Sequence, residues 1–411
     1  MYSYFTNYNL SLIGLYISFI EVCSMRIGIM TFWWANDNYG QLLQCYALQK
    51  YLRDLGHDAF LIRYKPANDA RRLTFKERAL YAARHPVQTL GIISAKFDKT
   101  KPLHTSGEEE RKRNFDGFRN EYIVSSERIY TSYKELAEQT PFADMYIVGS
   151  DQIWNFETAF NMNVINSWFL NFVPRGAVKG SYAASFGRNA LSLDVQKAIK
   201  PLLKDFDFVT VRENSGAAIC KKMGVEANVV CDPTLLLSKQ QYCQLFAEIQ
   251  PPKKKYVFLY LLSNTCSFSV RKLSAWCRTN DFELVYVSGN EGWKKCDYDD
   301  GEIEKSYLTI PEWLAYLSNA EYVITNSFHC SLFSLLFEKK VAVVPLRGSV
   351  KNTNNRIDSL FSNLKVHKSE IKKNDFITLL SLRSQEINTD FIERSRQILN
   401  SFFTGVKKDI S

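Results

Sequence analysis

A short polar motif follows an apolar run near residue 324. Asn326-Ser327-Phe328-His329 lies between the run Tyr322 to Thr325 and an almost wholly apolar segment of helical pattern that begins at Cys330. A buried helix starting here would point its N-terminus at the edge of a sheet, with His329 at that end. The positive end of a helix disfavours the imidazolium form, so the pattern predicts a neutral imidazole ready to exchange a proton.

Other interpretations of this motif stay open. A histidine in such a position is often a structural residue with satisfied hydrogen bonds. A nucleophilic Cys330 or Ser327 with His329 as its base is conceivable, but adjacent residues at a helix start rarely face each other. The sequence also shows no evident acid that would orient the imidazole.

A second polar turn follows the apolar run that ends at Val148. Gly149 permits close approach of the backbone to a ligand, and Ser150, Asp151 and Asn155 supply hydrogen-bonding groups beside Trp154. Because ligands of open parallel sheets bind beyond the carboxyl ends of strands, this turn is a candidate binding site.

Arg212 also ends an apolar run, directly before a helical segment that begins at Asn214. A guanidinium beside a helix N-terminus can hold phosphate or carboxylate bidentately. An ion pair with Glu213, or one between domains, explains Arg212 equally well.

A further loop, Asn36-Asp37-Asn38-Tyr39-Gly40, precedes a helical segment from Gln41. Its free amide donors suit an anion, although Asn and Asp are also ordinary helix caps.

The elements that must position these residues alternate between strands and helices, as parallel βαβ units require. A chain of 411 residues favours two domains. The predicted fold class is α/β, with two open, doubly wound parallel sheets. Strands are predicted at 27–31, 59–64, 145–148, 180–184 and 208–212 in the first half, and at 228–231, 256–262, 283–287, 322–325 and 341–345 in the second. Helices are predicted at 41–55, 193–204, 214–223, 267–278 and 330–338.

The predicted domains are residues 25–225, with a helical insertion at 65–125, and residues 226–389. Within the insertion we expect a mobile loop near 99–110. The segment 390–411 is expected to form a helix that crosses back to the first domain. Residues 1–24 are expected to lie outside the fold, because Met25 directly precedes the first strand and an upstream start codon chosen in error would explain them.

Composition limits the classes of partner. A net charge of +9 concentrates between Arg71 and Lys101, which suits an anionic ligand, a membrane face or simply solvated charge. No nucleic-acid-binding motif accompanies it, so nucleic acid is not an expected partner. Nine cysteines without a CxxC pair indicate reduced thiols in the cytoplasm and disfavour zinc; no metal and no cofactor are expected.

Taken together, the motifs resemble the polysaccharide pyruvyl transferase family. The resemblance rests on their order along the chain, which is listed here: Gly28-Ile29, Asn38-Tyr39-Gly40 with the helix from Leu43, Val148 to Asn155, Tyr182 to Gly187 including Ser185, Val211-Arg212-Glu213, Asp232-Pro233-Thr234-Leu235-Leu236, Asn326 to His329, and Asn355-Arg356-Ile357.

The resemblance implies two Rossmann-like, doubly wound parallel-sheet domains facing a cleft, which is a GT-B-like arrangement. It also implies transfer of pyruvate from phosphoenolpyruvate, as co-substrate, to a sugar as a ketal. It implies His329 as the acid/base residue and Arg212 as the anion clamp, with Ser327 and Phe328 beside them. Some members carry Arg two residues before the histidine, where this chain has Ser327. The missing cation would then have to come from Arg356 or Arg347.

The expected acceptor is a surface-polysaccharide precursor, lipid-linked or free, modified in the cytoplasm or at the inner face of its membrane. The sequence favours no particular oligomeric state. A GT-B-like nucleotide-sugar glycosyltransferase and a non-catalytic sugar-binding relative are the alternatives.

Overall fold

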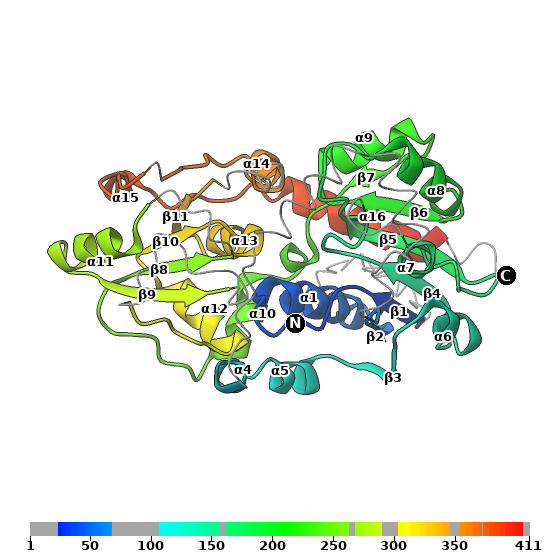
Figure 1. Cartoon of the computed structure of the whole chain (residues 1–411), viewed down its shortest axis with the longest axis horizontal. Coiled ribbons are helices and arrows are strands. Elements are labelled where there is room, and N and C mark those ends of the chain that lie inside the picture. The colour runs from blue at the N-terminus through cyan, green and yellow to red at the C-terminus, as the bar shows by residue number, and fades with distance from the viewer. Residues whose placement is uncertain are drawn as a thin grey trace, which may run out of the picture.

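The computed structural model describes residues 24–67, 107–156, 161–262, 268–289, 303–345, 354–371 and 373–405. These residues form two parallel sheets, which Figure 1 shows side by side. The predicted extension at residues 1–24 lies outside the described residues except for Ser24, as do the basic residues from Arg71 to Lys101, most of the loop near 99–110, and Arg347.

The first sheet has seven strands, all paired in parallel, in the order β3-β2-β1-β4-β5-β6-β7. The strands are β1 Arg26–Met30, β2 Asp58–Tyr64, β3 Ser125–Tyr130, β4 Met145–Val148, β5 Val178–Ala184, β6 Phe208–Val211 and β7 Asn228–Val229. The chain runs outward from β1 in one direction and from β4 in the other. The point between β1 and β4 is therefore where this doubly wound sheet leaves room for a ligand at its carboxyl edge.

The second sheet has four parallel strands in the order β11-β10-β8-β9. They are β8 Tyr256–Leu261, β9 Glu283–Ser288, β10 Tyr322–Thr325 and β11 Lys340–Val343. The fold class predicted from the sequence, two doubly wound parallel sheets, is confirmed.

Two details of the strand prediction need correction. The run at 228–231 was expected to open the second sheet, but Asn228 and Val229 pair with Thr210 and Val211 and so form the edge of the first sheet. Strand β3 was not expected at all. Its sequence, Ser125 to Tyr130, is mostly polar and half-buried to exposed, as an edge strand can be, and so lacks the apolar run that marks the central strands.

The helices connect and cover these sheets. Their bounds are α1 Tyr39–Asp54, α4 Gly107–Arg113, α5 Phe115–Tyr122, α6 Tyr133–Glu138, α7 Met162–Trp168, α8 Leu193–Leu203, α9 Asn214–Lys222, α10 Lys239–Cys243, α11 Val270–Thr279, α12 Ile310–Asn319, α13 Phe328–Leu336, α14 Asn354–Asn363, α15 Thr378–Ser381 and α16 Asp390–Gly405, with short 3-10 turns at η1 Pro233–Leu235 and η2 Gln244–Phe246. The predicted insertion contains α4 and α5 within its described part.

Helices α1 and α13 are buried along most of their length. Helix α13 is apolar nearly all round and so has no solvent face. On α1 the polar Gln44 and Gln49 are buried with their amides hydrogen-bonded, so both helices lie between other layers. One hydrophobic cluster runs from β1 and α1 through α12 and α13, which joins the two sheets into a common core. The N-termini of α1 and α13 meet within this core.

Helix α16 follows the second sheet in the chain but packs on the first (Figure 1). Phe402 stacks on Phe208 of β6 with ring centroids 3.9 Å apart, and Ser395 accepts a hydrogen bond from the backbone of Cys231 at 2.9 Å. Within the described ranges, no helix combines the length and apolarity needed to cross a bilayer.

Candidate active site

The imidazole of His329 lies where the N-termini of α1 and α13 meet. His329 is in the first turn of α13, which Ser327 caps by accepting a hydrogen bond from the Cys330 amide at 3.3 Å. Its ring packs against the backbone of Gly40, in the first turn of α1, so closely that a Cβ at position 40 would lie 2.2 Å from Nδ1. Glycine at position 40 is therefore required for this placement of the imidazole.

Asp232 is the acid that faces His329. Its Oδ2 atom lies 3.5 Å from Nε2 of His329 and 2.9 Å from Nη1 of Arg212, and it is 3.4 Å from the Ser150 hydroxyl. Its other oxygen accepts hydrogen bonds from the Thr234 amide and hydroxyl. Burial alone would raise the pKa of Asp232, but His329 and Arg212 outweigh it and hold the pKa well below its usual range.

Sequence reasoning did not include Asp232 among the site residues. It occurs in the Asp232-Pro233-Thr234 motif, where it caps a 3-10 turn, and that role alone explains an Asp before Pro. The signal that could have identified it is its position directly after β7, at the carboxyl edge of the first sheet.

Arg212 is surrounded by carboxylates of the protein. Besides Asp232, its guanidinium lies 3.7 Å from Glu213 and 3.9 Å from Asp151, and it stacks over the Phe328 ring at 4.5 Å. Burial acts to lower the pKa of Arg212, but the three carboxylates raise it, so the group stays charged. Its Nε and Nη2 atoms are nonetheless buried without a hydrogen-bond acceptor among the described residues.

Arg356, on α14, supplies a second guanidinium to the same place. Burial and the nearby Arg212 lower its pKa to about 10, which leaves it charged at neutral pH. With the Gln152 amide oriented to satisfy both groups, its oxygen accepts from Nη1 of Arg356 at 2.8 Å. The Nε atom of Arg356 has no acceptor in the described part of the chain.

A cavity of about 10 Å³ lies between Arg212, Phe328 and Arg356. That is about the space one water molecule occupies, so no organic substrate fits in this conformation. Arg212 and Asp232 belong to the first sheet, whereas Phe328, His329 and Arg356 belong to the second. An organic ligand could therefore bind between Arg212 and Arg356 only if these two groups of residues separated, as in enzymes that close over their substrates.

The Gly149 turn supports this site from the first sheet. Gly149 has a φ of +124°, and a Cβ there would lie 2.2 Å from the Tyr182 carbonyl oxygen, so the close approach is to strand β5 and not to a ligand. The Ser150 amide and hydroxyl both donate to Gln44, at 3.2 and 2.9 Å. Ser185 donates to Glu213 at 2.7 Å and accepts from the Gly187 amide. These residues hold Glu213 and Asp232 in position.

Five of the predicted binding residues serve the structure. Tyr39 is fully buried, stacks on Trp313 and donates to the Leu308 carbonyl at 2.7 Å. Trp154 is fully buried and donates to the Trp168 carbonyl. Asn38 caps α1, Asn155 accepts from Arg188 at 2.7 Å, and the Asn326 side chain accepts from the Leu262 amide at 2.7 Å, fixing the turn before His329.

Cys330 is not suited to nucleophilic attack. Burial raises the pKa of its thiol to about 12, so the thiolate is scarcely populated at neutral pH. The Ser327 hydroxyl is occupied as the cap of α13. Of the groups in this motif, the imidazole of His329 is the one suited to exchange protons.

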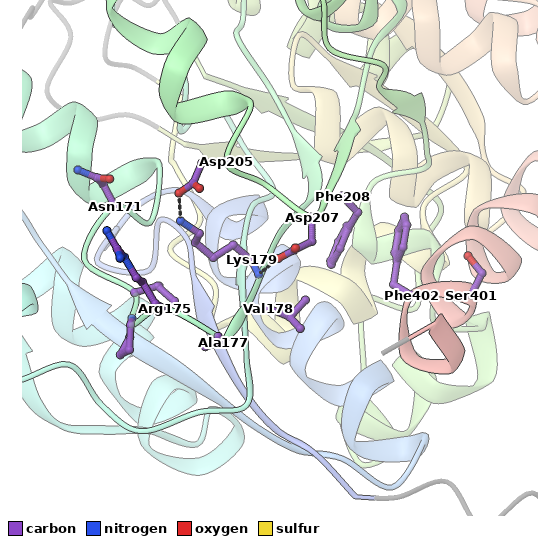
Figure 2. Close-up of a pocket in the computed structure, with 13 residues that line it drawn as sticks. Asn171, Arg175, Ala177, Val178, Lys179, Asp205, Asp207, Phe208, Ser401 and Phe402 are labelled. Carbon is purple, nitrogen blue, oxygen red and sulfur yellow. Dashed lines mark hydrogen bonds and ion pairs between the residues drawn. The ribbon is translucent and has the colours of Figure 1, made fainter. Parts of the chain in front are cut away.

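A larger cavity, of about 980 Å³, lies at the other edge of the first sheet (Figure 2). Figure 2 shows Lys179 held between Asp205 and Asp207, with Phe208 facing Phe402 of α16. Val178 and Phe208 begin β5 and β6, so this cavity is at the amino ends of the strands. Ligands of open parallel sheets bind at the opposite edge, and none of the residues around His329 lines this cavity.

The sequence match agrees with the geometry. The family model described as polysaccharide pyruvyl transferase matches residues 38–346, which include Gly40, Arg212, Asp232 and His329. The chain belongs to the polysaccharide pyruvyl transferase family. No curated protein matches it.

Solved structures share the fold of this family member at low sequence identity. The S. aureus MnaA structure with UDP is 13% identical, covers 94% of this chain and 98% of its own, and has a TM-score of 0.50. The UDP-GlcNAc 2-epimerase of Methanocaldococcus jannaschii is 11% identical, covers 92% of this chain and 100% of its own, and has a TM-score of 0.46. At such identities the first likeness shows the GT-B-like fold alone.

Proposed function

We propose that this protein transfers a pyruvyl group from phosphoenolpyruvate to two hydroxyls of a saccharide in a polysaccharide precursor. One observation carries the proposal. Buried polar atoms without hydrogen-bond partners among the described residues gather in one place: Nε and Nη2 of Arg212 and Nε of Arg356, whose side chains line a small cavity, and Nε2 of His329, which lies 3.5 Å from Asp232 in the same lining. Buried donors of this kind are costly unless a ligand satisfies them.

Phosphoenolpyruvate has the matching chemistry. Its phosphate and carboxylate are the planar or multidentate acceptors that guanidinium groups bind best. The like charge of Arg212 lowers the pKa of Arg356, and an anion between the two guanidiniums would relieve this repulsion. Some family members have an Arg where this chain has Ser327. Arg356 would supply the positive charge that is missing at that position.

The reaction needs a group that carries protons. One hydroxyl oxygen of the saccharide bonds to C2 of phosphoenolpyruvate while C3 takes up a proton and becomes a methyl group. The second hydroxyl oxygen then bonds to C2 as the bond from C2 to the phosphate oxygen breaks. Of the two hydroxyl protons, one ends on C3 and the other leaves with inorganic phosphate.

His329 is the residue we assign to this proton transfer. Its Nε2 atom is buried beside Asp232, which lines the cavity, and has no hydrogen-bond partner among the described residues. The Asp232 carboxylate, 3.5 Å away, would balance the positive charge of the imidazolium that forms. Asp232 also fixes the orientation of the ring, and so acts as a positioning residue.

Binding and turnover test the proposal together. Calorimetry with the full chain should detect phosphoenolpyruvate, and phosphate release should require a saccharide acceptor. His329→Gln should keep phosphoenolpyruvate binding and lose about 10²- to 10⁴-fold in turnover. Saturable binding of UDP-sugars with none of phosphoenolpyruvate would overturn the proposal in favour of a nucleotide-sugar glycosyltransferase.

Arg356 offers a test of the donor site alone. Removing its charge in Arg356→Gln should weaken phosphoenolpyruvate binding by about 10- to 100-fold, the loss expected for hydrogen bonds to a charged group. Arg175→Gln is the matched control, because Arg175 lines the separate cavity of Figure 2. Equal affinity in the two variants would show that Arg356 does not bind the donor.

A further inference from the structure

A second cavity lies at the same carboxyl edge of the first sheet as the candidate active site. Its volume is about 310 Å³, at the lower end of the range typical of small-molecule sites. Trp33, Trp34 and Asn36 after β1 line one side, Arg63 and Lys65 from the end of β2 line another, and α5 closes it with Asp116, Arg119 and Asn120. We call it the Trp–Arg cavity.

The Trp–Arg cavity is joined to His329 by a short piece of chain. Asn36 lines the cavity, and Gly40, four residues later, packs against the His329 imidazole. A ligand seated beside Asn36 therefore lies next to the segment that forms one wall of the acid/base site. The Trp–Arg cavity thus lies at the same edge of the sheet as the cavity of about 10 Å³ between Arg212 and Arg356, which has to open before it can hold a donor substrate.

The wall formed by residues 33–36 is held in place before any ligand binds. Arg119 donates to the Ala35 carbonyl and to the Asn36 side chain, both at 2.8 Å, and its own charge is paired with Asp116. The Trp33 indole donates to the Tyr64 carbonyl at 3.1 Å. Because these hydrogen bonds already hold residues 33–36 in place, less conformational entropy is lost when a ligand binds there.

The lining has the chemistry of a saccharide site. The half-buried Trp34 indole offers an apolar surface for the C–H face of a sugar ring, while the amides of Asn36 and Asn120 and the carboxylate of Asp116 can bond hydroxyls. The side chain of Asp116 is 83% exposed, so one of its oxygens remains accessible beside the Arg119 pair.

The charge of the cavity narrows the class of saccharide. Arg119 is balanced by Asp116, but in the part of the chain that the structure describes neither Arg63 nor Lys65 has an acidic partner. Arg63 donates to the Glu127 backbone carbonyl, and its Nε atom is buried without any acceptor in the described ranges. Two uncompensated cations beside an aromatic surface favour an anionic sugar.

We propose that the Trp–Arg cavity is the acceptor subsite, and that Arg63 and Lys65 make it selective for a saccharide that carries phosphate or carboxylate. The role as acceptor subsite rests on the proposed pyruvyl transfer. The binding of an anionic saccharide does not, and it can be measured without phosphoenolpyruvate.

The test compares glucose 1-phosphate, glucuronic acid, glucose and inorganic phosphate as probes, with the quenching of tryptophan fluorescence as the signal. In the full chain, at least one anionic sugar should bind about tenfold or more tightly than glucose and than inorganic phosphate. A preference for glucose 1-phosphate identifies a phosphorylated acceptor, and one for glucuronic acid identifies an acidic sugar.

The double variant Arg63→Gln/Lys65→Gln should remove this preference. Lys50→Gln/Arg53→Gln is the matched control, since it also removes two positive charges from the first domain, but at the end of α1 and near the amino end of β2. The control should bind the probes as the unmodified protein does. Equal affinities for glucose and both anionic sugars, or a preference unchanged by the double variant, would overturn the proposal.

The outcome is separable from that of the proposed function. If anionic sugars bind through Arg63 and Lys65 but phosphoenolpyruvate does not bind, the cavity stands as a saccharide site and the assigned donor fails. If phosphoenolpyruvate binds and the double variant leaves sugar affinity unchanged, the Trp–Arg cavity is ruled out while the proposed reaction stands.

Discussion

Replacing Asp232 by Asn removes one negative charge from the candidate site while keeping the shape of the side chain. Arg212 would lose its shortest ion pair, 2.9 Å, inside a site where both side chains are almost completely buried. Breaking one partner of a buried pair usually costs about 3–5 kcal/mol. Glu213 and Asp151 remain within 4 Å of the guanidinium, so we expect a loss near the lower end, about 3 kcal/mol.

The same change should slow catalysis. An Asn at position 232 cannot balance the charge of a His329 imidazolium, and its amide group can donate to Nε2, which would block that nitrogen. We expect kcat to fall by about 10²- to 10⁴-fold. The KM for phosphoenolpyruvate should change far less, because Arg356 still binds the anion. A merely structural role for Asp232 would lower stability and leave kcat of the folded protein unchanged.

Urea unfolding at pH 7 and steady-state phosphate release measure the two effects. Asp205→Asn is the control, because Asp205 is 62% exposed and pairs with Lys179 in the cavity of Figure 2. Exposed ion pairs contribute about 1 kcal/mol or less, and this one is remote from His329. If Asp232→Asn matched the control in both stability and kcat, the central role given to Asp232 would be refuted.

Three further outcomes follow from the same geometry. Gly40→Ala should displace the His329 imidazole, because the new methyl group would occupy the position of the ring. We expect steady-state kinetics to show kcat at least tenfold lower, with little change in phosphoenolpyruvate affinity. Tyr39→Phe should cost about 1 kcal/mol in urea unfolding and leave KM unchanged, since its hydroxyl bonds the Leu308 carbonyl and not a ligand. Lowering the pH should narrow the stability gap between the unmodified protein and Asp232→Asn. Because the pKa of Asp232 is lower in the folded protein than in the unfolded chain, the ionised carboxylate stabilises the fold fully above about pH 4 and progressively less below it. Urea unfolding at pH 7 and pH 3 measures this difference.

Most of the strand positions follow from patterns within the sequence. The central strands of both sheets are buried on both faces, so runs such as Met145 to Val148 and Tyr322 to Thr325 are apolar throughout and mark their own positions. The edge strands of the first sheet lack this signal. β3 is mostly polar, so no apolar run marks it. β7 has only two residues, so local periodicity predicts neither that it is an edge strand nor which sheet it joins.

The candidate site could be located from the sequence but not assembled from it. His329, Arg212 and Ser150 each follow a strand. Because ligands of parallel sheets bind at the carboxyl edge, all three were predicted to be site residues. That rule cannot separate Tyr39 and Trp154, which turn into the core, from neighbours that face the site. Their burial depends on side chains such as Trp313 and Trp168, far away in the chain.

The contacts that matter most join residues of the two sheets. Gly40 and Asp232 come from the side of the first sheet, and His329 comes from the second, so the distance between Asp232 and His329 depends on how one sheet sits against the other. Helix α16 helps to fix that arrangement, because it follows the second sheet and stacks Phe402 on β6. The acid/base site is complete only when the two sheets are together, and the same arrangement leaves about 10 Å³ between Arg212 and Arg356. Under the proposed function, substrate binding and catalysis therefore need different separations of the two sheets. A variant that weakens the stacking of Phe402 on Phe208 should alter both substrate affinity and kcat, although neither residue contacts a substrate.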